Sequence, residues 1–324
     1  MGEREVATMI DLYIVIPCYN EQEVLPETSK RLAEKYKQLV DHNKISDKSR
    51  IVFVDDGSKD NTWTMIEELH KESVIFSGVK LSRNKGHQNA LLAGLSTVSG
   101  LADAYISMDA DLQDDINAID GFIEEFEKGN EVVYGVRSAR KKDTFFKKYT
   151  AEMFYKLMSH MGAEVVFNHA DYRLLGDRAL KALLEFKEVN LFLRGIVPMV
   201  GFKSSKVYYE RNERFAGESK YPLNKMIAFA TQGITSLSIK PIRMIMSVGF
   251  FTVFVSFAML VYFLVRHFTG NTVSGWTSTI VSIWALGGLQ LLAIGVIGEY
   301  IGKIYLETKE RPRFIIEKFV NEEE

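Results

Sequence analysis

Short apolar runs alternate with longer amphipathic segments through the first part of the chain. Runs rich in β-branched residues predict buried strands, namely Leu12–Ile16, Ile51–Val54, Val79–Leu81, Ala104–Met108 and Glu131–Tyr134. Between them, apolar residues at helical spacing predict helices over about 23–40, from Trp63 to Leu69 with Asp60 as its N-cap, through Ala90 and Leu95, and over 119–126. The alternation predicts a mainly parallel sheet with helices on both faces.

Each predicted strand is followed by a polar cluster. These clusters occupy 17–21, 55–58, 82–86, 109–113 and 135–140, and Pro17 is expected to end the first strand. Because ligands of open α/β sheets bind beyond the carboxyl ends of the strands, we expect the clusters to line one crevice. One such cluster would be interpreted as a solvated turn, but their repetition after successive strands favours a binding site.

Most of the long apolar runs follow residue 240. Ile242–Val265 and Ser278–Ile304 are each long enough to cross the hydrocarbon of a bilayer, and two buried helices of a soluble core are the weaker alternative. Glycines in the second run would permit close helix contact and self-association. The preceding stretch, 222–241, is amphipathic and is predicted to lie along the membrane interface.

Basic residues flank the two apolar runs on their outer sides, whereas the connecting segment has few charges. They are Lys225, Lys240 and Arg243 before the first run, and Lys303, Lys309, Arg311 and Arg313 after the second. This asymmetry predicts that both termini and the α/β domain face the cytoplasm. The predicted organisation is an α/β domain over 1–221, an interfacial segment over 222–241, a two-helix membrane domain over 242–305 and a cytoplasmic tail over 306–324.

Composition and charge exclude some functions. The 324 residues carry 40 basic and 42 acidic side chains, a net charge of −2 that gives no sign of a nucleic-acid partner. The single cysteine, Cys18, can form neither an intrachain disulfide nor a cysteine-based metal site. No Gly-x-Gly-x-x-Gly motif follows the first strand, which excludes a Rossmann dehydrogenase.

Two carboxylates, Asp109 and Asp111, stand one residue apart at the end of a predicted strand. Oxygen ligands on a tight turn suit Mg²⁺ or Mn²⁺, which keep waters and substrate phosphates in their coordination shell. Such an ion would offset the charge of a diphosphate leaving group. An isolated Asp-x-Asp is more often a solvated turn, so the interpretation depends on the neighbouring motifs.

The motifs, taken in order, resemble those of family 2 glycosyltransferases with the GT-A fold. They are Val15–Glu21 (VIPCYNE), Val54–Ser58 (VDDGS), Leu81–Gly86 (LSRNKG) and Asp109–Gln113 (DADLQ). Three later motifs narrow the resemblance to polyprenyl-phosphate glycosyltransferases, the group that includes dolichol-phosphate mannose synthases and bacterial undecaprenyl-phosphate glucosyl- and N-acetylglucosaminyltransferases. These are Asp171–Leu174 (DYRL), Arg214–Tyr221 (RFAGESKY) and Gly298–Tyr305 (GEYIGKIY).

The resemblance implies a role for each motif residue. The residues expected to bind the nucleotide sugar are Pro17, Tyr19, Glu21, Asp55, Asp56, Asp109, Gln113 and Arg137. Those expected to hold Mg²⁺ or Mn²⁺ are Asp109, Asp111 and Gln113. Those expected near the acceptor phosphate are Arg140, Arg214, Ser219 and Lys220. The implied catalytic residues are Asp111, Asp171 and Arg214.

The implied reaction is transfer of a sugar from a UDP-sugar to undecaprenyl phosphate at the cytoplasmic face, with inversion at the anomeric carbon. Glucose is the first expectation for the sugar and N-acetylglucosamine the second, for a lipid-linked donor used in cell-envelope glycan modification. Asp171 matches a position proposed as general base in relatives. However, a phosphate monoester has a second pKa of about 6 and needs little deprotonation at neutral pH. Asp171 is therefore expected instead to orient a basic side chain or a sugar hydroxyl, and Asp171→Asn to lose much less activity than Asp111→Asn.

Other functions stay open at this point. A synthase of the dolichol-phosphate-mannose type would use GDP-mannose. A processive polysaccharide synthase normally has more spans and a Gln-x-x-Arg-Trp element, which the sequence lacks. A non-catalytic membrane scaffold would not need Asp109, Asp111 and Gln113. Expected partners are membrane lipids, a second copy of the chain, a flippase and a downstream glycosyltransferase.

Overall fold

The computed structural model describes residues 9–138, 169–189, 192–210, 235, 238–269 and 275–321. Contacts divide these residues into two units, which are described separately. One takes in 9–138, 169–210 and 312–321, apart from the gaps named above, and the other lies within 235–311.

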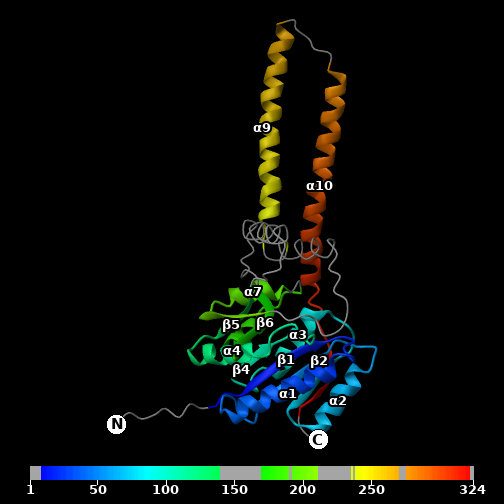
Figure 1. The fold of residues 1–324 in the computed structure, drawn as a ribbon. Coiled ribbons are helices and arrows are strands. Elements are labelled where there is room, and N and C mark those ends of the chain that lie inside the picture. Colours follow the sequence, from blue (N-terminus) through cyan, green and yellow to red (C-terminus); the bar gives the residue numbers. More distant parts are fainter. Residues whose placement is uncertain are drawn as a thin grey trace, which may run out of the picture. The chain divides into compact units, whose positions relative to one another are not determined.

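The first unit is built on one mixed sheet (Figure 1). Its strands are β1 (Leu12–Cys18), β2 (Arg50–Asp55), β3 (Phe76–Leu81), β4 (Ala104–Ser107), β5 (Val132–Arg137), β6 (His169–Gly176), β7 (Ser204–Tyr209) and β8 (Ile316–Val320). They lie in the order β7-β5-β6-β4-β1-β2-β3-β8. β6 runs antiparallel to β4 and β5, and β8 runs antiparallel to β3, whereas the remaining pairs are parallel. The prediction of a mainly parallel sheet is confirmed.

Helices cover both faces of this sheet. Successive residues of a strand point to opposite sides, and apolar residues at successive positions therefore give the sheet two apolar faces to cover. In β1, Leu12, Ile14 and Ile16 pack into one core cluster and Tyr13 and Val15 into the other. The first cluster takes residues from α1 (Leu25–Asp41), α2 (Thr62–Glu72) and α4 (Ala118–Glu127). The second takes residues from α3 (His87–Val98), α6 (Asp177–Leu184) and α7 (Leu193–Met199). The predicted helices on both faces are confirmed.

Two local predictions were wrong, the end of β1 and the N-cap of α2. Pro17 does not end β1, which continues through Cys18 and pairs with β2 there. Proline has no N–H to donate, but Pro17 needs none here. The pairing of β1 with β4 ends at Val15, whose carbonyl oxygen accepts the Met108 N–H, so Pro17 lies beyond the last paired residue on that side. Asp60 is not the N-cap of α2, since Asn61 holds that position; the Asp60 carboxylate instead accepts the Thr62 N–H at 3.1 Å.

Ile316–Val320, inside the segment 306–324 predicted as a cytoplasmic tail, forms β8, the edge strand of the sheet beside β3. Val320 lies against the face of Gly78, where a Cβ atom would meet its Cγ2 at 3.0 Å. In the sequence, a short apolar and charged segment after a long apolar run gave no sign of such a distant partner strand.

The second unit holds two long helices, α9 (Lys240–Phe268) and α10 (Trp276–Thr308). Both are long and apolar enough to cross a membrane, and large apolar side chains such as Phe250, Phe254 and Leu291 are exposed on them. A buried core helix would cover such side chains. Within this unit, Tyr300 donates its hydroxyl hydrogen to Ser238 O. Most of the predicted interfacial segment 222–241 lies outside the described residues.

Candidate active site

The loops that follow β1 and β2 are joined by hydrogen bonds. Asn20, whose φ is 55°, donates its N–H to Ser58 Oγ at 2.9 Å, and its side-chain oxygen accepts the Lys59 N–H at 2.9 Å. Glu21 N–H donates to Thr62 Oγ1 at 2.9 Å. These bonds explain why asparagine, which tolerates the left-handed conformation, stands at position 20. They fix the backbone on which the predicted residues Tyr19 and Glu21 stand.

The predicted nucleotide residue Asp55 is fully buried at the end of β2. Its Oδ1 accepts the Ser58 N–H at 3.2 Å, whereas Oδ2 is buried without a hydrogen-bond partner among the described residues. Burial raises the pKa of this carboxyl group. A buried acceptor without a partner is costly in the protein alone. Asp55 is therefore suited to accept an N–H or O–H from a ligand. Tyr19, on the loop after β1, is 42% exposed.

The second carboxylate of the pair, Asp56, has a different role from Asp55. Its two oxygens accept the backbone N–H groups of Lys85 and Gly86, at 2.6 and 2.9 Å. Asp56 thereby holds the loop after β3 against the loop after β2. Gly57 allows this approach, because a Cβ atom there would lie 2.6 Å from the backbone carbon of Arg83.

The turn 109–113 follows β4 and is held in an unusual conformation. Leu112 has φ 57°, a left-handed value that costs a non-glycine residue of this size about 1–2 kcal/mol. Its side chain is buried, and Ala110 O accepts the Thr28 hydroxyl hydrogen at 2.8 Å. Gln113 N–H donates to Asp111 Oδ1 at 3.1 Å. Strain maintained by surrounding contacts is typical of functional turns.

Negative charge accumulates around Asp109. Burial, with Asp114, Asp171 and Asp111 nearby, raises the pKa of Asp109 to about 6, although His87 opposes the shift. His87 Nε2 lies 3.4 Å from Asp109 Oδ1. A cation would relieve this repulsion, so the donor set suits Mg²⁺ or Mn²⁺. Among the described residues, however, no group of three or more His, Cys, Asp or Glu side chains is arranged to hold a metal ion.

Asp171, which was predicted to be a catalytic residue, lies between two arginines at the start of β6. Its Oδ1 is 2.5 Å from Arg173 Nη2, and its Oδ2 is 3.0 Å from Arg194 Nη2. Burial alone would raise the pKa of Asp171, but Arg194 and Arg173 outweigh burial and hold that pKa well below its usual range. A carboxylate of this kind is a weak base. The geometry agrees with the expectation that Asp171 orients a basic side chain.

Arg137 lies at the end of β5 and is held by two neighbours. Its Nη2 is 3.3 Å from Asp114 Oδ1, and its Nε donates to the Tyr209 hydroxyl oxygen at 3.3 Å. Asp114 directly follows the turn 109–113, so Arg137 is tied to that turn. The other predicted acceptor residues, Arg140, Arg214, Ser219 and Lys220, lie outside the described residues.

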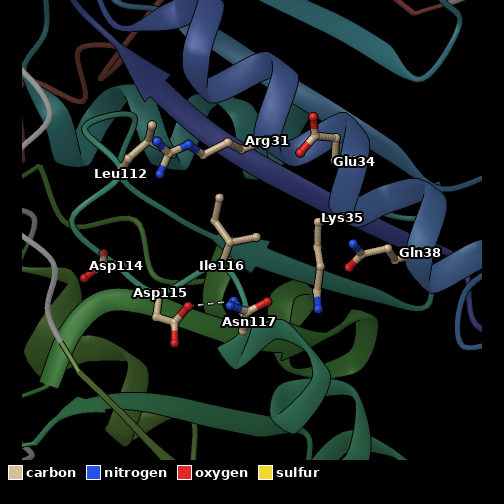
Figure 2. Close-up of a pocket in the computed structure, with 9 residues that line it drawn as sticks. All are labelled: Arg31, Glu34, Lys35, Gln38, Leu112, Asp114, Asp115, Ile116 and Asn117. Atoms are coloured by element: carbon tan, nitrogen blue, oxygen red, sulfur yellow. Dashed lines mark hydrogen bonds between the residues drawn. The ribbon is translucent and has the colours of Figure 1, made fainter.

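A polar pocket lies on the α1 side of the segment that follows this turn, and Figure 2 shows its lining. The lining residues are Arg31, Glu34, Lys35, Gln38, Leu112, Asp114, Asp115, Ile116 and Asn117. Neither Asp109 nor Asp111 is among them. The predicted crevice is therefore supported by the contacts between the loops, not by this pocket.

A comparison of the sequence with models of protein families identifies the family of this chain. The model described as glycosyl transferase family 2 matches residues 13–184, more than half of the chain. The chain belongs to glycosyl transferase family 2. It is a glycosyltransferase, and its mixed, mostly parallel sheet is a GT-A-like fold.

The chain is also similar to individual proteins of known sequence or structure. An uncharacterized glycosyltransferase of Bacillus subtilis, YkoT, is 52% identical over 94% of this chain and 91% of its own. A bactoprenol glucosyl transferase of Shigella phage SfX is 39% identical over 94% of this chain and 97% of its own. Among solved structures, mannosyl-3-phosphoglycerate synthase from Rubrobacter xylanophilus covers 69% of this chain and 71% of its own, at 14% identity and a TM-score of 0.46.

Three site residues of this family 2 enzyme were not assigned roles from the sequence. His87 lies beside Asp109, Asp114 holds Arg137, and Arg194 holds Asp171. For Asp114, the run of acidic residues after the turn was a usable signal. Arg194 was visible only as an isolated polar residue, and His87 only as the residue after a predicted loop.

Proposed function

We propose that this enzyme transfers glucose from UDP-glucose to undecaprenyl phosphate at the cytoplasmic face of a membrane, with inversion at the anomeric carbon. The observation that carries the proposal is an acidic segment at the carboxyl end of β4, with His87 beside Asp109 and Arg137 beside Asp114. It occurs in a chain 39% identical over nearly its whole length to a bactoprenol glucosyl transferase. The name of that relative supports both the sugar and the lipid.

The nucleotide would bind at the ends of β1 and β2. The buried Oδ2 of Asp55 is an acceptor suited to the N–H of uracil or to a ribose hydroxyl. Tyr19 and Glu21 stand on the adjoining loop, which is fixed through Asn20. Asp56 would contribute mainly by holding the loop at Lys85 and Gly86.

We further propose that Asp109, Asp111 and Gln113 hold Mg²⁺ or Mn²⁺ together with the donor diphosphate. Because these side chains are too few for a complete metal shell, the phosphate oxygens would supply further ligands. Bound there, the ion would offset the developing charge of the UDP leaving group. The raised pKa of Asp109 is consistent with a site that gains from a cation.

The acceptor phosphate would be the nucleophile, and the protein would position it. Its monoanion or dianion needs no strong base at neutral pH, in agreement with an Asp171 carboxylate held by two arginines. Arg137 is a candidate for donor phosphate contacts, and Arg140, Arg214, Ser219 and Lys220 for contacts to the acceptor. Orientation and charge stabilisation would then supply most of the rate enhancement.

The two apolar helices would keep the enzyme in the membrane that holds its lipid substrate. Extracting the lipid would cost about 0.8 kcal/mol per exposed CH₂ group. Both termini would face the cytoplasm, and α10 would allow self-association through its glycines. A flippase and a downstream glycosyltransferase would use the product in the cell envelope.

The test uses the full chain, purified in detergent, with undecaprenyl phosphate and labelled UDP-glucose, UDP-N-acetylglucosamine or GDP-mannose, each with Mn²⁺, Mg²⁺ or EDTA. We expect label in the lipid fraction from UDP-glucose, dependent on the metal, and none with Asp111→Asn. Transfer only from another donor would replace glucose. A polymeric product would favour a processive synthase, and nucleotide binding without transfer to any lipid would favour a scaffold.

A further inference from the structure

Arg194 has no role in the sequence motifs, yet its backbone is anchored from two sides. The preceding residue, Leu193, donates its N–H to Gln88 Oε1 at 2.9 Å, and its carbonyl oxygen accepts from Arg173 Nη1 at 3.5 Å. Gln88 belongs to α3 and Arg173 to β6, so two separate elements fix the start of α7. Because Leu193 is itself buried, the main chain at Arg194 has little freedom.

The side chain of Arg194 is oriented as firmly as its backbone. Its Nε donates to Asp171 Oδ1 at 3.3 Å and its Nη2 to Oδ2 at 3.0 Å. A two-point contact of this kind fixes the plane of a guanidinium group. Asp171 is also paired with Arg173, so its carboxylate is shared between two cations.

Exposure distinguishes the two arginines. The side chain of Arg173 is 2% exposed and that of Arg194 is 29% exposed, whereas Asp171 retains 13%. In the cluster of Asp171, Arg173 and Arg194, Arg173 is therefore the buried cation and Arg194 is the cation that reaches solvent.

The cluster lies close to the acidic turn. Ser107, the last residue of β4, donates its hydroxyl hydrogen to Asp171 O at 2.5 Å. Asp109 follows two residues later, and the charge of Asp171 contributes to its raised pKa. A fixed, partly exposed guanidinium beside carboxylates suited to a metal is the arrangement expected for binding phosphate oxygens.

We propose that Arg194 contacts a phosphate oxygen of a substrate and that Asp171 is a positioning residue that acts through Arg194. This inference rests on the proposed transfer to a lipid phosphate. The oxyanion belongs either to the donor diphosphate or to the acceptor phosphate, which present the same chemistry to a guanidinium group. A general base at Asp171 would instead have to take up a proton between two guanidinium groups.

The experiment compares Arg194→Ala, Arg194→Lys and Asp171→Asn in the full chain, with Arg178→Ala as the control. Arg178 lies on α6, and its side chain is 75% exposed. The readouts are kcat, KM for UDP-glucose and for undecaprenyl phosphate, and calorimetric binding of UDP with Mn²⁺. We expect Arg194→Ala to lower kcat/KM by roughly 100-fold, the effect of removing one stabilising donor. Arg194→Lys should recover part of the loss, and Arg178→Ala should match the wild type.

The two sources of phosphate give different results. Weaker UDP binding in Arg194→Ala would place the contact on the donor diphosphate. A higher KM for undecaprenyl phosphate with unchanged UDP binding would place it on the acceptor, and either result supports the inference.

A double variant separates positioning from base catalysis. If Asp171 acts through Arg194, Asp171→Asn combined with Arg194→Ala should be no slower than Arg194→Ala alone. Independent roles would multiply the two losses and would overturn the positioning role. If Asp171→Asn does not fold, as judged by thermal melting, the comparison of Arg194→Ala with Arg194→Lys still tests whether Arg194 acts as a phosphate-binding cation.

Two results would overturn the inference outright, and they are distinguishable. A wild type that transfers glucose, with an Arg194→Ala variant of equal kcat and KM, would refute the role of Arg194 alone. A wild type that transfers no sugar to undecaprenyl phosphate would refute the proposed function and this inference with it.

Discussion

Asp114 accepts a hydrogen bond from the Tyr209 hydroxyl at 2.6 Å, although 95 residues separate the two in sequence. The bond ties the segment after β4 to the end of β7. Burial, together with the charge of Asp114, raises the pKa of Tyr209, so the hydroxyl remains a donor throughout the physiological range. Because Arg137 contacts both groups, its position depends on this pair.

Tyr209→Phe should therefore both destabilise the protein and loosen Arg137. Asp114 is 1% exposed, and a buried acceptor that loses a partner costs about 1–3 kcal/mol. Tyr208→Phe is the matched control, because Tyr208 is the neighbour on β7 and is 67% exposed. Thermal melting and UDP affinity measure the two effects. Equal behaviour of the two variants would show that the Asp114 contact contributes nothing.

Gly57→Ala should disrupt the loops that we propose to bind the nucleotide. Gly57 has φ +66°, and a Cβ atom there would lie 2.6 Å from the backbone nitrogen of Asn84. Gly129 has a similar φ of +79° with nothing within 4 Å of its Cβ position, so it controls for backbone conformation alone. Gly129→Ala should cost about 1–2 kcal/mol, and Gly57→Ala clearly more, with loss of UDP binding. Equal melting temperatures and unchanged UDP affinity in Gly57→Ala would contradict this reasoning.

The strands and helices of the first 138 residues could be predicted because each is a local pattern. β1, for example, is apolar on both sides because it lies between two helical layers, and its run of residues shows this directly. The polar clusters after the strands were also predictable. Parallel strands bring their carboxyl ends to one edge of the sheet, whatever the details of packing.

The rest depends on contacts that the local sequence does not encode. β6 and β8 are antiparallel to the strands beside them, and those neighbouring strands lie far away in the sequence. The pairing of Asp171 with Arg194 could not be identified either, because it depends on the packing of α7 in the core beside the sheet. The different roles of Asp55 and Asp56 likewise follow from the loop after β3, which bonds to Asp56 alone.

Asp109→Asn should raise the melting temperature of the metal-free protein at pH 8. The folded-state pKa of Asp109, about 6, is above the ordinary value of about 3.9. The folded protein therefore binds the proton more tightly than the unfolded chain, and it loses stability as the pH rises from about 4 to above 6. The carboxamide avoids this loss, so its advantage should be larger at pH 8 than at pH 5.

The measurement for Asp109 is thermal melting in EDTA at both pH values, repeated with Mn²⁺ and UDP. Ligand should stabilise the wild type and not Asp109→Asn, because only the wild type keeps the carboxylate that we propose to hold the metal. A variant that melts below the wild type at pH 8 in EDTA would argue against the raised pKa.

Removal of β8, which lies in the segment 306–324 predicted as a cytoplasmic tail, should weaken the first unit. A chain ending after Arg311 would uncover the β3 edge and the face of Gly78 that Val320 covers. We expect the melting temperature to fall by roughly 4–8 °C, as a loss of about 2 kcal/mol produces in a domain of this size. The β3 amides should also exchange faster with deuterium.

The control for this truncation separates strand pairing from surface charge. Glu317 and Lys318 of β8 form ion pairs with Lys80 and Glu67, each at 2.8 Å. Because such exposed pairs contribute little, Glu317→Ala combined with Lys318→Ala should melt close to the wild type. If the double variant fell as far as the truncation, the ion pairs and not the strand would hold the edge. Unchanged exchange in the truncated chain would show instead that β3 needs no neighbouring strand at this edge.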